Sequence, residues 1–299
     1  MRRSVLVLLL AASVILVGCS PREAGLPNAG YDLSELQSVE SIAAMVPQDV
    51  KERGVLRNGA AIDYPPAEFT SHIDGKTSLG YDIDIARALA KVMGLSGAET
   101  THTTFEKLLD QVGTNVDLSI SSFTISPSRS ANYAMISYIE VGSQFAVAKG
   151  NPTKFDPFEP CGKTIGVQKG SYQEAELLPT MSQACEQEGK DTIVIKAHQL
   201  QTEIAPKVIA GQYDAALADS PVIDYTISQF DEELETVGDI VAAAKQGIVI
   251  SKDNRQLIDA TALAMQELMD NGTLAAILSH YGVDSLALKT AKIYEEGKS

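Results

Sequence analysis

Short strand-like runs alternate with amphipathic helical patterns over most of this 299-residue chain. The strand-like runs are rich in β-branched and apolar residues, and the helical patterns repeat apolar residues every three to four positions. The expected strands are 55–59, 116–120, 144–148, 164–168, 192–195, 215–218 and 247–250. The expected helices are 82–93, 105–112, 174–178, 203–209, 256–269 and 273–281. This alternation favours an α/β fold with parallel strands.

The first residues indicate export. Two arginines at positions 2 and 3 precede an apolar run over residues 5–17, which is shorter than the ~20 residues of a membrane-spanning helix and is typical of a secretory signal. The run ends in Leu16-Val17-Gly18-Cys19, which resembles a bacterial lipoprotein box. The resemblance implies a signal peptide of residues 1–18 and a lipid on Cys19 that anchors the protein to the outer face of the cell membrane. The alternative is an ordinary signal followed by an unrelated cysteine.

The charge balance excludes one class of partner. Asp and Glu total 39 against 24 Lys and Arg, a formal net charge of −15. Such a surface repels phosphate backbones, so we expect no nucleic-acid binding. It also repels an anionic membrane, which fits attachment through a lipid. Removing the signal leaves about 280 residues, enough for one large domain or two of medium size.

Two cysteines remain besides Cys19, namely Cys161 and Cys185. Outside the cytoplasm such a pair favours one disulfide. The bond would close a loop of about 25 residues, to which the chain-entropy model assigns roughly 3 kcal/mol. Two free thiols or a metal-binding pair are the alternatives. The four histidines are scattered, so we expect no metal site.

Several segments in order resemble the amino-acid-binding proteins of polar amino-acid ABC importers, solute-binding protein family 3. The matching segments are 63–69 (DYPPAEF), 74–76 (DGK), 80–84 (GYDID), 116–118 (VDL), 121–129 (SSFTISPSR), 162–171 (GKTIGVQKGS), 213–221 (YDAALADSP) and 270–274 (DNGTL). Each segment alone is weak, but their order and spacing over residues 50–285 make the resemblance specific. The cysteine pair that flanks the second-half motif is similar to an actinobacterial type of the family.

The resemblance implies a two-lobed periplasmic-binding-protein-like fold of type II, with two hinge strands and a ligand cleft between the lobes. Carried onto this chain, lobe 1 is residues 50–145 plus 250–290, and lobe 2 is residues 152–244. The hinges are expected at 145–151 and 245–251. Residues 19–49 form a lipid-anchored tether and N-terminal extension, in which the stretch from about 20 to 30 reads as flexible.

The charged ends of a free amino acid need partners of opposite charge. Arg129 suits the carboxylate because a guanidinium group can make two parallel charge-assisted hydrogen bonds. The resemblance places Arg129 and Thr124 in the site; without it, an arginine after a Pro-Ser turn reads as a solvated loop charge. Ser171 stands where a strand gives way to a helix, so it can bind an anion or cap the helix. Asp219, at the end of a strand, is the natural partner for the ammonium group.

The resemblance also identifies aromatic walls and contacts to the ligand side chain. Tyr64 and Phe105 are expected to enclose the side chain, although Phe105 could equally be a core residue. Ser122 is expected to contact the ligand through its carbonyl group, and Gln168 occupies a position where some relatives read the side chain. Where many relatives have an aspartate, this chain has Ala61, which weakens any inference about a cationic ligand side chain. Asp82 is expected to cap a helix.

These features predict that the chain binds a polar amino acid outside the cytoplasm and delivers it to the permease of an ABC importer, as a monomer and without a cofactor. An enzyme on the same fold, such as a cyclohexadienyl-dehydratase-like lyase, is the main alternative, and a ligand-sensing module is another. An enzyme would need a positioned glutamate or histidine in the cleft, and the candidate cleft segments offer none. The sequence does not identify the amino acid or the permease.

Overall fold

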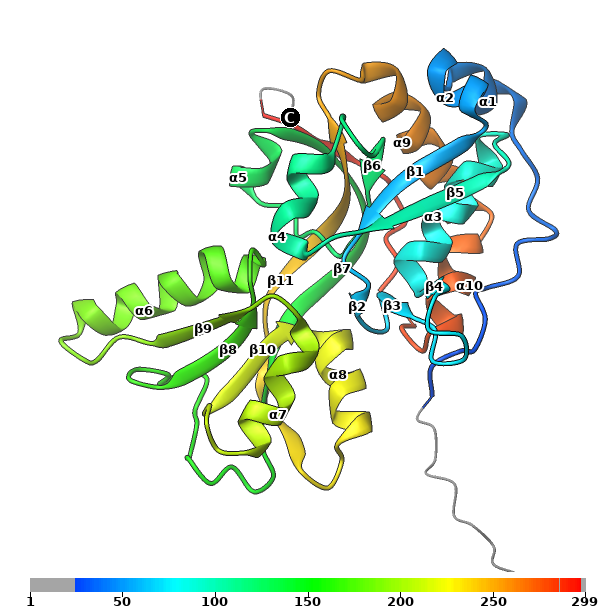
Figure 1. Cartoon of the computed structure of the whole chain (residues 1–299). Coiled ribbons are helices and arrows are strands. Elements are labelled where there is room, and N and C mark those ends of the chain that lie inside the picture. Colours follow the sequence, from blue (N-terminus) through cyan, green and yellow to red (C-terminus); the bar gives the residue numbers. More distant parts are fainter. Residues whose placement is uncertain (1–24, 285, 297–299) are drawn as a thin grey trace, which may run out of the picture.

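Two long antiparallel strands run through both lobes of the molecule (Figure 1). They are β7 (Tyr133–Ala148) and β11 (Leu234–Ser251), paired from Tyr133 opposite Ser251 to Ala148 opposite Leu234. The structure is a computed structural model that describes residues 25–284 and 286–296. The predicted signal peptide and the predicted lipidation site Cys19 lie outside these residues.

The first lobe combines the N-terminal half of the chain with its last helices (Figure 1). Its further strands in the large sheet are β1 (Val55–Ala60), β5 (Gly97–His102), β6 (Leu118–Ser119) and β12 (Ile293–Tyr294). A small antiparallel sheet contains β2 (Asp63–Tyr64), β3 (Glu68–Thr70) and β4 (Ser78–Leu79). The helices are α1 (Glu40–Met45), α2 (Gln48–Arg53), α3 (Tyr81–Val92), α4 (Phe105–Leu108), the 3-10 turn η1 (Leu109–Gln111), α5 (Pro127–Ser130), α9 (Arg255–Asp270) and α10 (Thr273–His280).

The second lobe is formed by the middle of the chain. Its strands are β8 (Thr164–Gln168), β9 (Val194–His198) and β10 (Ala215–Asp219). Its helical segments are the π-helical turn η2 (Gln173–Leu177), α6 (Leu178–Gln187), the 3-10 turn η3 (Gln201–Glu203), α7 (Ile204–Ile209) and α8 (Ser220–Gln229).

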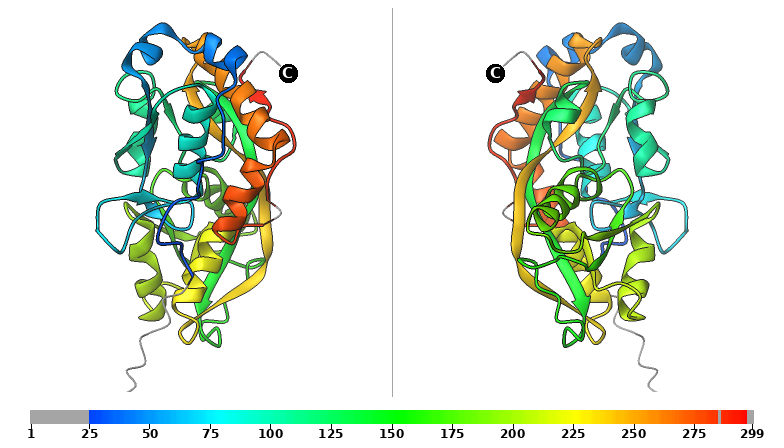
Figure 2. Two further views of the ribbon diagram at one scale, coloured as in Figure 1. Left: turned by 90° about the vertical axis from the view of Figure 1, so that its right-hand side faces the viewer. Right: turned by 90° about the vertical axis from the view of Figure 1, so that its left-hand side faces the viewer.

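The strand order confirms the predicted α/β architecture. The large sheet runs β5-β1-β6-β11-β7-β10-β8-β9, with β12 also paired to β7. Strand β1 is parallel to β5 and β6, and β8 is parallel to β9 and β10, as the alternation of strands and helices predicts. The antiparallel pair β7–β11 lies along one side of the molecule and joins the two parallel units (Figure 2).

Strand β7 crosses from the first lobe to the second lobe at an earlier residue than the sequence analysis predicted. Strand β12 pairs with β7 at Met135 and Ile136, whereas β10 pairs with it at residues 143–146. The predicted hinge 145–151 therefore begins among the strands of the second lobe, and that placement is wrong. In β11 the register shifts lie between Val237 and Gly247, which overlaps the start of the predicted hinge 245–251. The lobe ranges 50–145 plus 250–290 and 152–244 stay a prediction, although β12 shows that the sheet extends beyond residue 290.

The N-terminal extension packs against the first lobe from Leu26 onward. The side chains of Leu26, Tyr31, Leu33, Leu36 and Val39 lie against the main hydrophobic core. The backbone N–H of Tyr31 donates to the carboxylate of Asp84 over 2.6 Å. A fully flexible tether up to about residue 30 is therefore wrong for the described part of this stretch.

Helix α3 shows how the chain builds this lobe. Ile85, Leu89 and Val92 repeat on one face and are fully buried, as the helical pattern predicts. Gly80 precedes the helix with φ of 124°, and a Cβ there would lie 2.1 Å from the carbonyl oxygen of Ala67, so the position requires glycine. The prediction that Asp82 caps this helix is wrong, because the N-cap is Gly80 and no side chain caps it.

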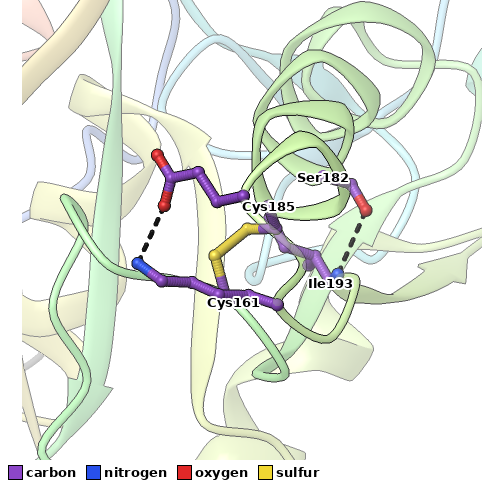
Figure 3. The surroundings of a disulfide bond; sticks show 6 residues. Cys161, Ser182, Cys185 and Ile193 are labelled. Carbon is purple, nitrogen blue, oxygen red and sulfur yellow. Dashed lines mark hydrogen bonds and ion pairs between the residues drawn. A yellow bond between two sulfur atoms is a disulfide. The ribbon is translucent and has the colours of Figure 1, made fainter.

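The structure confirms the predicted disulfide between Cys161 and Cys185, which stand 24 residues apart in the sequence. Figure 3 shows that the bond ties the loop before β8 to helix α6. Nearby, the Ser182 hydroxyl accepts a hydrogen bond of 3.1 Å from the backbone N–H of Ile193. Cys185 belongs to the core of the second lobe with Phe145 and Leu178. The bond therefore fixes α6 to the edge of that core.

Replacing both cysteines by alanine is expected to lower the free energy of unfolding by roughly 3 kcal/mol, because the open loop gains conformational entropy in the unfolded chain. Alanine is used instead of serine because serine would leave a hydroxyl group at the buried position 185. The measurement is urea denaturation of wild type and the double variant. Intact mass after alkylation without reductant should show no label on either cysteine of the wild type. An unchanged unfolding midpoint would contradict this estimate.

Candidate functional site

A small cavity lies between the two lobes. Its lining contains all eight ligand-binding residues that the sequence predicted, which are Tyr64, Phe105, Ser122, Thr124, Arg129, Gln168, Ser171 and Asp219. Two residues that the sequence did not predict, Tyr172 and Gln173, complete the lining. The volume of this cavity is about 10 Å³, roughly the space of one water molecule, so the lobes must move apart to admit a ligand.

Arg129 is the cation of the cavity and comes from the short helix α5 of the first lobe. Its Nη1 donates to the carbonyl oxygen of Thr124 over 2.9 Å, and its Nη2 donates to the carbonyl oxygen of Gly170 over 3.0 Å. The guanidinium carbon also lies 5.4 Å from the ring centre of Phe123 and 5.7 Å from that of Phe105. These contacts aim the guanidinium group across the cleft toward the second lobe.

Arg129 is only 9% exposed and makes no ion pair within 4 Å among the residues that the structure describes. Burial lowers the pKa of its guanidinium group to about 10, which still leaves it charged at neutral pH. Its direct hydrogen-bond partners are neutral carbonyl groups, and the charges of Glu176 and Asp219 act on it without a direct ion pair, which compensates a buried cation only in part. An anionic ligand group in the cavity would supply the missing counter-charge.

Asp219 is the anion of the cavity and stands at the carboxyl end of β10 in the second lobe. Its Oδ1 accepts a hydrogen bond of 2.8 Å from Gln173 Nε2, and its Oδ2 accepts one of 2.7 Å from Gln246 Nε2. Burial raises the pKa of this carboxyl group to about 6, while the bonds to Gln173 and Gln246 oppose the rise. The carboxylate is thus held in place by neutral amides and can accept a cationic ligand group.

Two aromatic rings from the first lobe bound the cavity. The Tyr64 hydroxyl accepts a hydrogen bond of 3.1 Å from the backbone N–H of Asp219, so this ring reaches across to the second lobe. Phe105 stacks on Phe123 with ring centres 4.8 Å apart and also belongs to a buried apolar cluster. Phe105 is therefore both a residue of this apolar core and part of the cavity lining.

The second lobe contributes two further predicted residues. The Ser171 hydroxyl accepts a hydrogen bond of 3.1 Å from the backbone N–H of Glu174, so Ser171 caps the following helical turn while it faces the cavity. Gln168 is 3% exposed at the end of β8, and its Nε2 has no hydrogen-bond partner within the described residues. A buried donor without a partner is costly, which makes Gln168 available to a ligand acceptor.

The sequence missed the residues that hold Asp219. Gln173 starts the π-helical turn η2, a local irregularity that often occurs at functional sites but has no periodic sequence signal. Gln246 lies on β11 next to a shift in its register with β7. Only the fold brings these two glutamines to one carboxylate.

Several direct contacts bridge the lobes and show a closed arrangement. Lys169 pairs with Glu106 over 2.6 Å, Ser128 donates to Glu176 over 2.7 Å, and the backbone N–H of Gln201 donates to Asp63 over 2.9 Å. Burial raises the pKa of Asp63 to about 6. Asp63 thus faces the inter-lobe contact at Gln201, away from the cavity that Tyr64 lines, as alternation along an extended segment predicts.

A larger groove of about 670 Å³ lies between the β2–β3 hairpin and helices α7 and α8. Its surface is mostly apolar, and its charged or titratable lining residues are Asp63, His72 and Tyr225. No arginine or lysine lines it, so it does not place a cation opposite an anion as the smaller cavity does. We therefore take the smaller cavity as the functional site. Within the described residues, no cluster of three or more His, Cys, Asp or Glu could hold a metal ion.

Comparison with known proteins places this geometry in one family. Residues 56–284 match the bacterial extracellular solute-binding proteins, family 3. The chain is 34% identical over 291 residues to the arginine-binding protein ArgT of Corynebacterium glutamicum, a match that covers 96% of this chain and 94% of that protein. It is 29% identical over 231 residues to the L-cystine-binding protein TcyJ of Escherichia coli K12, covering 76% of this chain and 82% of TcyJ.

A solved structure of an ancestral arginine-binding protein bound to arginine has the same fold, with a TM-score of 0.69 at 26% identity. The superposition covers 77% of this chain and 98% of that one. The fold, the family match and the 34% identity along nearly the whole chain agree with one another. This chain belongs to the bacterial extracellular solute-binding proteins of family 3.

Proposed function

We propose that this chain captures a free polar amino acid outside the cytoplasm and delivers it to the permease of an ABC importer. The observation that carries the proposal is the placement of a buried cation, Arg129, and a buried anion, Asp219, on opposite lobes of one closed cavity. A free amino acid at neutral pH carries one charge of each sign. Arg129 would bind its carboxylate and Asp219 its ammonium group, so the ligand itself would bridge the lobes.

Arginine is the first candidate ligand, because ArgT is named as an arginine-binding protein and is 34% identical over nearly the whole chain. The cavity lacks the aspartate that many relatives have at position 61. Ala61 is fully buried there, and its backbone N–H donates to the Ser121 hydroxyl over 3.0 Å. A guanidinium side chain would instead lie against the faces of Tyr64 and Phe105, as cation–π contact allows, with Gln168 as its polar neighbour.

Binding rather than catalysis is the better reading of this cavity. General acid–base catalysis needs a titratable side chain within reach of the reacting atoms. The lining contains no histidine, glutamate or lysine, and its one carboxyl group, Asp219, is already held by Gln173 and Gln246. The alternative of a lyase on the same fold therefore lacks a free carboxyl, imidazole or amine group in the cavity lining.

Screening the mature protein against the twenty standard amino acids by thermal shift tests the proposal. A ligand at 100 times its Kd adds about 2.7 kcal/mol to the free energy of unfolding. For a protein of this size that corresponds to a rise in Tm of roughly 5 °C. We expect L-arginine to give the largest shift. If none of the twenty shifted the Tm of a folded sample, the proposal would be wrong.

We also propose that the mature protein is anchored through a lipid on Cys19. The support is the sequence Leu16-Val17-Gly18-Cys19 after the apolar run. No helix in residues 25–284 or 286–296 has the length and apolar character to cross a membrane. Cys19→Ser is expected to give an unprocessed precursor or a released protein when cell fractions are probed by immunoblotting. Normal processing with membrane retention of this variant would contradict the anchor.

A further inference from the structure

Two fully buried carboxyl groups, Glu68 and Asp82, lie directly behind the cavity wall and have no part in the binding scheme above. Glu68 belongs to β3 and stands opposite Tyr64 in the β2–β3 pair, so the two side chains share one face of the hairpin. Asp82 belongs to the first turn of α3 and hydrogen-bonds to Ser122, which lines the cavity. The pair therefore connects two elements to the wall of the site.

Asp82 is surrounded by donors. Its Oδ1 accepts a hydrogen bond of 2.7 Å from the Tyr138 hydroxyl. Its Oδ2 accepts one of 2.7 Å from the backbone N–H of Ser122 and one of 3.3 Å from the Ser122 hydroxyl. Hydrogen bonds that end on a carboxylate stabilise its charged form. Asp82 thus has the environment of an ionised group.

Glu68 has a different environment. Its Oε1 accepts a hydrogen bond of 2.6 Å from the Ser121 hydroxyl, whereas its Oε2 has no donor among the described residues. The consecutive residues Ser121 and Ser122 bond to Glu68 and to Asp82 respectively, which places the two carboxyl groups near each other, and the charge of Asp82 acts on Glu68. Ionised carboxylates are acceptors only, so a hydrogen bond between the two groups needs a proton. Two carboxylates that share a buried site cannot both be ionised without a large electrostatic cost.

We propose that Glu68 is a neutral carboxylic acid that donates its proton to Asp82, and that this acid–carboxylate pair positions Ser121 and Ser122 at the ligand cavity. The proton on Glu68 does not depend on the identity of the ligand. The effect on binding rests on the proposed function.

The surrounding charges support this arrangement. Burial, followed by the charge of Asp82, raises the pKa of Glu68 well above its ordinary value, and burial raises the pKa of Asp82 to about 6. The other titratable groups that interact electrostatically with Glu68 are Asp63 and Tyr64 of β2, Tyr81 of α3 and Tyr138 of β7. Burial raises the pKa of all three tyrosines well above the usual value, so they stay neutral and only the two aspartates add negative charge. Both shifts favour a pair that keeps one proton over a pair that loses both.

The pair reaches the cavity through two short chains of contacts. Ser121 donates to Glu68 and accepts from the backbone N–H of Ala61, three residues before Tyr64. Ser122 has φ of 55°, a left-handed conformation that non-glycine residues seldom adopt, and its N–H is held by Asp82. Loss of the shared proton would place two anions in contact behind both serines and release this conformation.

The test compares wild type with Glu68→Gln, since glutamine keeps one donor and one acceptor but has no proton to lose. Above the ordinary value of 4.5 an unfolded glutamate is ionised, while folded Glu68 keeps its proton. Folding then takes up a proton, so the wild type unfolds more easily as the pH rises until the pKa of the folded state is reached. We expect the ratio of the wild-type to the Glu68→Gln unfolding constant to rise as the pH is raised above about 6.5, by about tenfold per pH unit for as long as folded Glu68 keeps its proton.

Denaturation at a series of pH values measures this ratio, and Glu99→Gln, at an exposed position on β5, controls for the loss of one carboxyl group. A flat ratio would overturn the proposal. Infrared spectra of wild type labelled with 13C-glutamate give a second readout that needs no variant. A label-sensitive carboxylic-acid band near pH 7.5 supports the proton on Glu68, and its absence contradicts it.

Ligand titration separates positioning from simple stability. Glu68→Gln is expected to bind L-arginine within about threefold of wild type, whereas Glu68→Leu, which lacks the donor and the acceptor, is expected to bind at least about tenfold more weakly. Equal losses in both variants would overturn the positioning role. If wild type did not bind L-arginine, the ligand assignment would fail, and the pH-dependent ratio would still decide the state of Glu68.

Discussion

Arg129→Ala is expected to weaken binding of L-arginine by at least tenfold. The substitution removes the one cation of the cavity and leaves the ligand carboxylate without a matched partner in a buried site. Truncating one partner of a buried hydrogen-bonded charge pair costs ~2–5 kcal/mol, and about 1.4 kcal/mol corresponds to a tenfold change in affinity. Isothermal titration calorimetry of the folded variant measures the loss.

Arg255→Ala is the matched control for this variant. Arg255 belongs to helix α9 of the same lobe, is 46% exposed and pairs with Asp259 and Glu295 at the surface. Its loss is expected to leave the affinity for L-arginine unchanged. If Arg129→Ala bound as tightly as Arg255→Ala, Arg129 would not contact the ligand carboxylate.

Asp219→Asn is expected to weaken binding by a comparable factor, because the ligand ammonium group loses its counter-charge. The fold should tolerate the change. Asparagine still accepts from Gln173, and Gln246 can turn its amide because its Oε1 has no other partner in the described residues. Asp214→Asn is the control, at a position just before β10 where the carboxylate accepts from the backbone N–H of Thr164. Equal affinity of the two variants would contradict the role of Asp219.

The raised pKa of Asp219 also sets the direction of a pH effect. Its carboxyl group has a pKa of about 6, and the ammonium group needs the ionised form. Lowering the pH from 7 to 5 protonates most of the carboxylate, so the apparent affinity should fall by about tenfold. Asp219→Asn should lose this part of the pH dependence. An affinity that stays constant over this range would show that the ionised carboxylate is not required.

Most helices and strands of the fold could be predicted from the sequence. The spacing of their apolar residues and the residue types at their ends are local signals. Strand β8 and helix α9 match their predicted ranges within a residue or two. Helices α1 and α2 were missed, since each is only six residues long and contributes one buried side chain, too few for a periodic pattern. The strand pair β7–β11 was seen only in fragments, because both strands change partners between the lobes without a break in the chain.

The site was predictable where a residue belongs to a quoted motif and was hidden where the fold alone brings it in. Arg129 and Asp219 lie in such motifs, and the structure places both at the cavity. Gln246 is separated from Asp219 by 27 positions, and no local pattern links the two residues. Asp82 was read as a helix cap from its place in the first turn. The competing hydrogen bonds from Ser122 and Tyr138 come from residues 40 and 56 positions away, which no local rule anticipates.

The central claim is that one zwitterionic ligand bridges Arg129 and Asp219. Calorimetry on a two-by-two set tests it most directly: wild type and Arg129→Ala, each titrated with L-arginine and with its decarboxylated amine, agmatine. Removing the carboxylate from the ligand should reproduce much of the loss seen with Arg129→Ala, and the substitution should then add little further loss for agmatine. Fully additive losses would show that Arg129 does not contact the carboxylate, and the ligand site would have to be placed elsewhere.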